Sequence, residues 1–219
     1  MEKVFAVIAA YNEERHIKKV VVDAKKYVDE VVVVDDGSRD NTKELAKYAG
    51  AIVLRHDVNL GKGAALKTGC EFALENGADV IVTIDADTQH DPSDIPRFLS
   101  ALKGCDVVLS YRKYGKAMPF ILKFGNQFIN KTIKFLYGLE IKDSQCGYRA
   151  FTIKAYKKLR WKANDYSIES EMIAKIGKCK LSYKELPIET VYADKYKGTT
   201  VLDGIKIVFN LLLWKLSKI

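Results

Sequence analysis

Short unbroken runs of hydrophobic residues alternate, in the first half of the chain, with stretches in which apolar residues recur every three or four positions. Four such runs are rich in Val and Ile, as buried parallel strands are: Val4–Ala9, Val31–Val34, Val80–Ile84 and Val107–Leu109. A weaker run predicts a fifth strand at Ala51–Leu54. Helical patterns lie between them, at Glu13–Tyr27, Thr42–Tyr48, Ala64–Glu75 and Ser93–Leu102, and Asp40 or Asn41 and Ser93 or Asp94 are suitable caps. This alternation predicts βαβ units and a mostly parallel sheet flanked by helices.

The pattern changes after about residue 111. An amphipathic helix is predicted over 119–137, and a polar loop follows at 142–149. A short strand–helix stretch, a helix near 168–176, a strand near 181–185 and a final helix over 201–217 complete the chain. Because no linker rich in Pro, Gly or Ser separates the halves, we expect a single α/β domain over residues 1–219.

Charge is distributed unevenly between the two halves. The chain has 219 residues and carries a formal net charge of +8. Its hydrophobic content of 48% is high enough to exclude a mainly disordered protein. Residues 1–110 hold 14 Lys and Arg against 19 Asp and Glu, whereas residues 111–219 hold 22 against 9. One half is therefore suited to cations and the other to anions. Nucleic-acid binding is not favoured, because no recognised motif is present and the clustered acids would have no role.

Cysteine spacing and hydropathy limit the cellular setting. The four cysteines form no zinc-type pair and no disulfide framework, which favours reduced thiols in the cytoplasm. The N-terminal apolar run Val4–Ala10 is too short for a signal peptide, and Ile207–Trp214 is too short to span a membrane. We expect no signal peptide and no transmembrane helix.

Acidic residues follow three of the predicted strands, where an open parallel sheet binds its ligands. Asp85 and Asp87 lie two residues apart at a strand end, so both carboxylates can face one side, and they repel unless a cation lies between them. Mg²⁺ or Mn²⁺ fits that arrangement, with Gln89 and His90 as further possible ligands. A D-x-D pair alone is weak, since surface acids occur by chance; its place at a buried strand end strengthens the interpretation.

Two further segments suit a nucleotide. Asp35 and Asp36 could bind metal or accept hydrogen bonds from a nucleotide, although Asp36-Gly37-Ser38 is also an ordinary turn sequence. The segment 59–64 is neither a P-loop nor a dinucleotide fingerprint. It leads into a helix N-terminus and carries Lys62, which suits an anion or a nucleotide edge, with a plain loop-to-helix turn as the alternative.

Two arginines come from the basic half. Arg112 follows a strand end, and Arg149 closes the loop Asp143–Arg149, which is rich in donors and too polar to be core. Guanidinium groups beside a metal site would suit phosphate, while surface salt bridges are the alternative.

Six motifs in order now match a known family: Ala10-Tyr11-Asn12-Glu13, Asp35-Asp36-Gly37-Ser38, Asn59-x-Gly61-Lys62-Gly63, Asp85-Ala86-Asp87-x-Gln89-His90, Ser110-Tyr111-Arg112 and Asp143-Ser144-x-x-Gly147-Tyr148-Arg149. Together they cover about residues 4–150. The chain resembles the family 2 inverting glycosyltransferases and, within them, the dolichyl- or polyprenyl-phosphate sugar synthases. The resemblance implies a GT-A fold, a divalent metal, and a UDP- or GDP-sugar donor.

The resemblance also implies roles for individual residues. It places the metal on Asp85, Asp87 and Gln89, and catalytic groups at Asp87, Arg112, Asp143 and Arg149. A third group, Lys123, Lys197 and Thr199, would contact the acceptor phosphate, the last two from the family's loop that closes over phosphates. The nucleotide sugar is expected near Ala10, Tyr11, Glu13, Asp35, Asp36, Lys62, Asp85 and Ala86.

The implied reaction moves a hexose with inversion to a polyprenyl (dolichyl) phosphate. A lipid phosphate is already ionised and needs no general base, so we interpret Asp143 as an orienting residue, with Glu169 and Glu171 as poorer base candidates. A family member acting on a sugar hydroxyl is the alternative. A sugar-1-phosphate nucleotidyltransferase is not favoured, because the required Gly-rich N-terminal loop is missing.

The apolar faces of the two amphipathic helices are interspersed with lysines, which is typical of helices on an anionic membrane surface. We therefore expect peripheral attachment at the cytoplasmic face. The alternative is that these faces pack on the sheet or on a second subunit in a homo-oligomer.

Overall fold

The structure is a computed structural model that describes residues 2–112, 120–189 and 201–217, with the side chains of 120–124 and 201–203 left aside. One sheet contains seven strands in the order β3-β2-β1-β4-β6-β5-β7. Their bounds are β1 Val4–Ala10, β2 Glu30–Asp35, β3 Ile52–Arg55, β4 Val80–Thr83, β5 Val107–Arg112, β6 Arg149–Thr152 and β7 Tyr183–Ile188. The five strands predicted in the first half and the strand near residue 181 are therefore all present.

The sheet is parallel apart from β6, which runs antiparallel between β4 and β5. Ala150 at its centre is paired with Val82 on one side and Val108 on the other. The N-terminal strands pair directly, with Val7 opposite Val32 in β2 and Thr83 in β4. A mostly parallel sheet is thus confirmed, and one antiparallel strand joins its two parallel parts.

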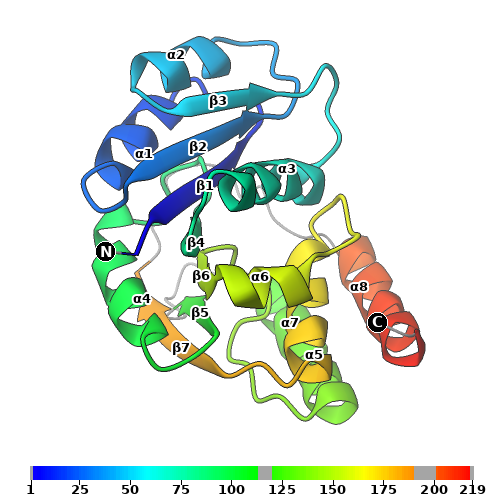
Figure 1. Ribbon diagram of the computed structural model, residues 1–219. Coiled ribbons are helices and arrows are strands. Elements are labelled where there is room, and N and C mark those ends of the chain that lie inside the picture. The colour runs from blue at the N-terminus through cyan, green and yellow to red at the C-terminus, as the bar shows by residue number, and fades with distance from the viewer. Residues whose placement is uncertain (1, 113–119, 190–200, 218–219) are drawn as a thin grey trace.

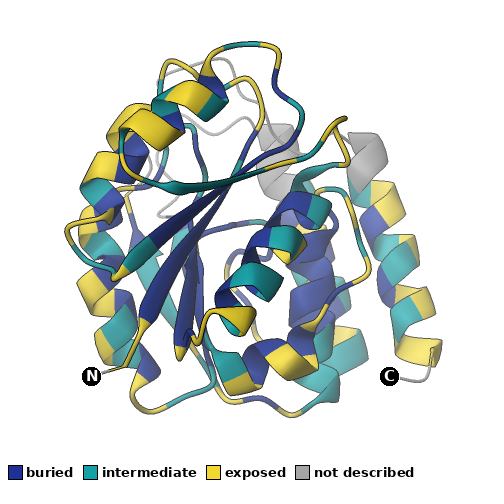
Figure 2. Cartoon of the chain, turned by 45° about the horizontal axis from the view of Figure 1, so that its top comes forward, coloured by how far each residue is buried: buried dark blue, intermediate teal, exposed yellow. Residues whose placement is uncertain are grey.

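Helices cover both faces of the sheet (Figure 1). One face is covered by α1 Ile17–Ala24, α2 Thr42–Tyr48 and α4 Ile95–Leu102. The other is covered by α3 Lys62–Glu75, α5 Phe120–Tyr137, α6 Ile153–Leu159, α7 Ile168–Lys178 and α8 Val201–Leu216. Side chains alternate between these layers, so Val7 belongs to one core and Ile8 to the other. Figure 2 shows buried strands between helices whose outer faces are exposed.

Two helix starts differ from the sequence prediction. α1 begins at Ile17, not Glu13, because the carbonyl of Glu13 accepts from the backbone N–H groups of His16 and Ile17 in a preceding turn. α4 begins at Ile95, two residues later than predicted; Asp94 occupies its N-cap position, as predicted, but its side chain makes no capping hydrogen bond. A side-chain cap is found earlier, where the Asp91 carboxylate accepts from the Ser93 N–H at 2.8 Å and starts a 3₁₀ turn.

The C-terminal helix packs against α5 and α7, with Ile207 and Leu211 buried in the shared core. A second apolar face of α8 remains exposed, and it comprises Ile205, Phe209, Leu212, Leu213 and Leu216. Part of the predicted amphipathic surface is therefore internal packing and part faces outward. Within the described ranges, no helix combines the length and hydropathy needed to cross a membrane.

Candidate active site

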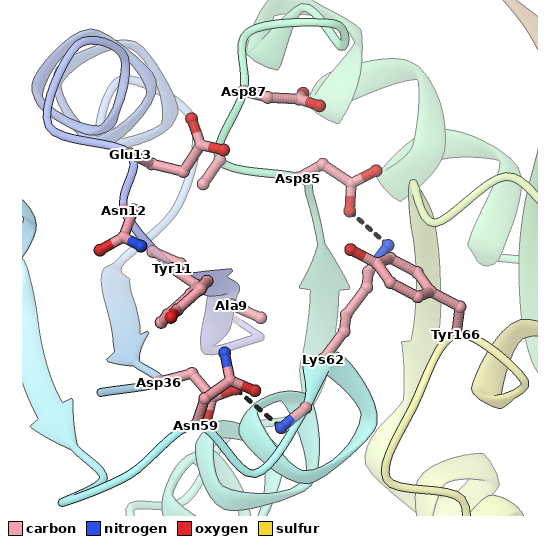
Figure 3. Close-up of a pocket in the computed structure, with 13 residues that line it drawn as sticks. Ala9, Tyr11, Asn12, Glu13, Asp36, Asn59, Lys62, Asp85, Asp87 and Tyr166 are labelled. Carbon is pink, nitrogen blue, oxygen red and sulfur yellow. Dashed lines mark hydrogen bonds and ion pairs between the residues drawn. The ribbon is translucent and has the colours of Figure 1, made fainter. Parts of the chain in front are cut away.

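A cavity of about 590 Å³ lies at the carboxyl ends of β1 and β4. The D-x-D segment, the start of α3 and Tyr166 surround it (Figure 3). Seven of the eight residues predicted for the nucleotide sugar line this cavity: Ala10, Tyr11, Glu13, Asp36, Lys62, Asp85 and Ala86. The eighth, Asp35, is fully buried. The sheet thus brings together residues that are far apart in the sequence.

Asp85 forms an ion pair with Lys62 inside the cavity. Its Oδ1 lies 2.7 Å from the Lys62 ammonium, as Figure 3 shows. Burial alone would raise the pKa of Asp85, but the charges of Lys62, His90 and Arg112 and the hydrogen bond from Lys62 together outweigh it and lower that pKa to about 2. The same pairing raises the pKa of Lys62 well above its usual range, against the opposite effect of burial. Both groups are therefore charged at neutral pH.

Asp87, the second acid of the pair, is held by its own turn. It accepts from the backbone N–H of Gln89 at 3.1 Å and from the Gln89 side-chain amide at 2.7 Å. Thr88 between them has a left-handed φ of 62°, which bends the chain sharply enough for these bonds to form. Gln89 therefore orients Asp87 through its amide nitrogen, an arrangement different from the metal ligation predicted for it.

The residues present suit a divalent metal that takes part of its shell from a substrate. Two carboxylates lie at the cavity wall, and hard oxygen donors of this kind suit Mg²⁺ or Mn²⁺. Among the residues that the structure describes, no group of three or more His, Cys, Asp and Glu is placed to hold a metal ion. A metal at Asp85 and Asp87 would thus need donor phosphates and water to complete its coordination.

His90 does not join this set, contrary to the suggestion that it adds a ligand. It is buried, its Nδ1 lies 3.5 Å from Asp85 Oδ2 without a hydrogen bond, and its Nε2 lies 3.6 Å from the Cys146 sulfur. Its ring stacks on Tyr148 with centroids 5.4 Å apart. His90 therefore packs behind Asp85 and away from the cavity.

Asp35 and Asp36 anchor the loops around the cavity. Asp36 accepts from the N–H groups of Leu60 and Gly61 at 2.9 and 2.8 Å, and from His56 Nδ1 at 2.7 Å. Asp35 accepts from the N–H of Ser38 at 3.0 Å, and its other oxygen lies 3.1 Å from Arg55. These bonds fix the loop that carries Lys62. Nucleotide contact by the two acids remains a prediction.

The N-terminus of α3 is closed by a segment from the basic half. The Asn164 carbonyl accepts from the N–H groups of Gly63 and Ala64 at 2.8 and 3.2 Å. Gly61 has a φ of 100°, and a Cβ there would lie 2.3 Å from the same carbonyl. The helix N-terminus is consequently not open to an anion as the sequence suggested, and Lys62 is the residue of α3 that lines the cavity, with Asn59 and Gly61 from the preceding loop.

Arg112 and Asp143 form a bidentate ion pair at the end of β5. Arg112 donates from Nε to Oδ2 at 2.7 Å and from Nη2 to Oδ1 at 3.1 Å. Asp143 also accepts from Asn126 and from the backbone N–H of Gln145. Burial opposes ionisation, but the charge of Arg112 and the hydrogen bonds from Arg112, Asn126 and Gln145 together outweigh it and lower the pKa of Asp143. An ionised carboxylate with both oxygens occupied orients Arg112, which agrees with the interpretation from sequence.

The segment 143–149 is not the exposed polar loop that the sequence predicted. Asp143, Ser144 and Arg149 are all buried. Arg149 begins β6 and donates to the backbone carbonyls of Cys146, Glu169 and Ser144 at 2.9, 2.8 and 3.0 Å. Its guanidinium therefore holds three chain segments together, and this geometry does not present it to phosphate.

Some predicted site residues lie outside the described part of the chain. Lys197 and Thr199 belong to 190–200, and Lys123 lies on α5 where side chains are left aside. Sequence reasoning missed Tyr166 as a cavity residue and gave Glu169 only a minor place. Glu169 is buried, with Oε1 2.8 Å from Lys62. The polar residues that precede α7 were the signal in the sequence for a functional segment. Their sequence does not reveal that they lie against α3, because that position depends on long-range contacts.

Comparison with known proteins defines the class. Glucosyl-3-phosphoglycerate synthase from Mycobacterium tuberculosis, solved with Mn²⁺, UDP-glucose and phosphoglyceric acid, superposes with a TM-score of 0.80 at 20% identity, covering 98% of this chain and 80% of that one. This likeness shows the fold, the GT-A fold of glycosyltransferases. The family model for glycosyl transferase family 2 matches residues 5–160. The chain therefore belongs to glycosyl transferase family 2.

Relatives of similar length align with nearly the whole chain at 28–38% identity. The UDP-N-acetylglucosamine–dolichyl-phosphate N-acetylglucosaminyltransferase of Methanococcus voltae is 36% identical over 244 residues, covering 99% of this chain and 97% of the relative. An uncharacterized protein of Methanocaldococcus jannaschii is 38% identical over 226 residues, covering 98% and 93%. The undecaprenyl-phosphate mannosyltransferase of Micrococcus luteus is 28% identical over 232 residues, covering 98% and 95%.

Proposed function

We propose that this glycosyltransferase moves a hexose or an N-acetylhexosamine from a UDP- or GDP-sugar to a polyprenyl (dolichyl) phosphate, with inversion at the anomeric carbon. The bonding of Asp143 is the observation that carries the choice of acceptor. A sugar hydroxyl would need a general base, and Asp143 is ionised but fully engaged by Arg112, Asn126 and Gln145. A phosphate monoester is already ionised near neutral pH. Relatives that act on dolichyl and undecaprenyl phosphate support the same acceptor.

In the proposed reaction, an oxygen of the lipid phosphate attacks the anomeric carbon opposite the leaving group. A new C–O bond forms as the bond to the nucleoside diphosphate breaks, and the electron pair leaves with the diphosphate. Lys62 would pair with phosphate charge on the donor side, and Arg112 would do so at the end of β5. A Mg²⁺ or Mn²⁺ ion at Asp85 and Asp87 would neutralise charge that develops on the leaving diphosphate.

We place this reaction at a membrane surface. The acceptor is a lipid, and the exposed apolar face of α8 offers a large hydrophobic area beside Lys206 and Lys215. A peripheral site of this kind would bring the acceptor phosphate to the protein while its chain stays in the bilayer.

The test is a transfer assay with a short polyprenyl phosphate, Mn²⁺ and a panel of UDP- and GDP-sugars. The expected product is lipid-extractable and labile to mild acid, and EDTA abolishes its formation until Mn²⁺ or Mg²⁺ is restored. Free sugar alone would overturn the proposed transfer. A product formed only on sugar hydroxyls would assign the chain to the alternative branch of the family.

A further inference from the structure

Lys62 lies between two carboxylates that come from opposite halves of the chain. Its ammonium is 2.7 Å from Asp85 Oδ1, at the end of β4, and 2.8 Å from Glu169 Oε1, in the first turn of α7. The side chains are 18% exposed for Lys62, 26% for Asp85 and 5% for Glu169. Of the two carboxylates, Asp85 therefore faces the cavity, and Glu169 lies behind the ammonium.

The negative charge of the two carboxylates exceeds the single positive charge of Lys62 between them. Glu169 Oε2 is buried and has no hydrogen-bond partner among the described residues, and one ammonium is shared by two carboxylates, so the three groups carry a combined formal charge of −1. An isolated buried carboxylate is costly, and here the Lys62 ammonium pairs with it at 2.8 Å. The arrangement is therefore stabilised by any additional cation at the cavity side.

Little space surrounds the ion pair. A Cβ added at Gly147 would lie 2.7 Å from the Lys62 ammonium and 3.0 Å from Asp85 Oδ1. The Tyr166 ring covers another side, with its centroid 5.9 Å from the ammonium. A divalent cation that took Asp85 Oδ1 would meet the Lys62 charge at close range. Like charges about 4 Å apart repel even in water, and more strongly in a partly buried site.

We propose that Lys62 is a resident cation of the donor site, which occupies Asp85 until metal and nucleoside diphosphate arrive together. On their arrival the ammonium leaves Asp85 for the phosphate oxygens, and Glu169 acts as the positioning residue that keeps it within reach. This inference rests on the proposed metal- and nucleotide-dependent function. It makes metal binding weak without nucleotide and couples the two ligands, because each removes the obstacle to the other.

The test measures Mn²⁺ binding to the intact chain by electron paramagnetic resonance, with and without UDP. Without UDP, Lys62→Met is expected to bind Mn²⁺ at least about tenfold more tightly than wild type, since the competing charge is gone. Glu169→Gln is expected to bind it more weakly, since one negative charge is lost. UDP should strengthen Mn²⁺ binding in wild type, and Lys62→Met should reduce that coupling.

Matched controls are available on the same helix. Lys67 and Glu75 are exposed residues of α3, so Lys67→Met and Glu75→Gln alter net charge equally and should leave Mn²⁺ affinity unchanged. Folding is checked by circular dichroism and by the thermal midpoint. If Lys62→Met does not fold, the opposite-signed effect of Glu169→Gln still decides the question.

The outcomes separate this inference from the proposed function. One outcome is that wild type binds Mn²⁺ with UDP while a folded Lys62→Met has unchanged or lower Mn²⁺ affinity. That result would overturn only the inference that Lys62 is a resident cation. A Glu169→Gln protein that binds Mn²⁺ as tightly as wild type would remove the role of Glu169 and with it the proposal. A wild-type protein that binds no Mn²⁺ with UDP, and none when GDP replaces UDP, would overturn both the inference and the metal dependence.

Discussion

The guanidinium of Arg112 donates two hydrogen bonds, of 2.7 and 3.1 Å, to the carboxylate of Asp143, and both side chains are buried. Planar, bidentate pairing of this kind fixes the orientation of both groups. Since Arg112 ends β5, the pair sets where a cationic group stands at the sheet edge. Because of this pairing, a substitution at Asp143 can distinguish two roles for its carboxylate: orienting Arg112, or acting as a general base.

An Asp143→Asn variant is expected to keep transfer to polyprenyl phosphate, at a rate reduced by about tenfold to a hundredfold through misplacement of Arg112. The measurement is the initial rate of lipid-linked product in protein shown to be folded. A general base would behave differently, because its loss would remove the acid limb of the pH–rate profile as well as most of the activity.

The same pair predicts how stability depends on pH. The pKa of Asp143 is lowered in the folded protein, so the unfolded chain binds more protons as the pH falls. The stabilisation is fully present above the ordinary carboxyl pKa of about 4 and is lost below it, as the pH falls through the folded value. Urea unfolding between pH 6 and pH 3 should show this decline, and Asp143→Asn should show a shallower one.

Gly61 and Gly77 form a natural comparison. Both have positive φ, 100° and 78°, but a Cβ at Gly61 would lie 2.3 Å from the Asn164 carbonyl, whereas nothing lies within 4 Å at Gly77. Gly77→Ala should cost only backbone strain, about 1–3 kcal/mol. We expect Gly61→Ala to cost more in unfolding free energy and also to weaken UDP binding, since Lys62 is displaced. Equal effects of the two substitutions would contradict the close approach.

Arg149→Met should destabilise the protein by about 3–5 kcal/mol, because a buried network loses its charged donor and three carbonyls lose their partner. Arg149→Lys should rescue little, since an ammonium cannot reproduce the planar fork. Equilibrium unfolding in urea measures both. Unchanged stability with a raised KM for the nucleotide sugar would instead support the phosphate contact predicted from sequence.

Phe209 and Leu213 are 61% and 48% exposed on the outer face of α8. The double change Phe209→Ser with Leu213→Ser should leave the thermal midpoint nearly unchanged and abolish flotation with anionic liposomes. Tyr48→Ser, at a residue 78% exposed on the distant α2, serves as the control. Flotation that survives the double change would refute the membrane surface, and a smaller assembly on size exclusion would assign this face to a second subunit.

Sequence patterns predicted the parts of the fold that depend on local order. The β-rich runs predicted β1, β2, β4 and β5, because strands buried on both faces are almost continuously apolar. The acids after those runs reached one cavity because parallel strands share a carboxyl edge. That rule brings Tyr11 and Asp85 together, whereas Lys62 was assigned to the same site through the family resemblance.

The parts that escaped prediction depend on distant partners. Arg149 is polar and charged, so nothing local indicates a buried strand; its burial is possible because carbonyls at residues 144, 146 and 169 accept its protons. Tyr166 reaches the cavity, and Glu169 reaches Lys62, because Asn164 and Trp161 bind the start of α3 from across the domain. Such contacts leave no periodic signal in the sequence.

The antiparallel strand β6 has a consequence for the order in which the chain can fold. β4 and β5 do not pair with each other, and each meets only residues 149–152 on its inner side. During synthesis β4 therefore stays an edge strand until residue 152 has left the ribosome, and the acids at its end cannot face Arg112 before then. The boundary at residue 110 separates an acidic part of the chain from a basic part, but it does not separate two folding units. Neither part contains all the strands that the single sheet needs.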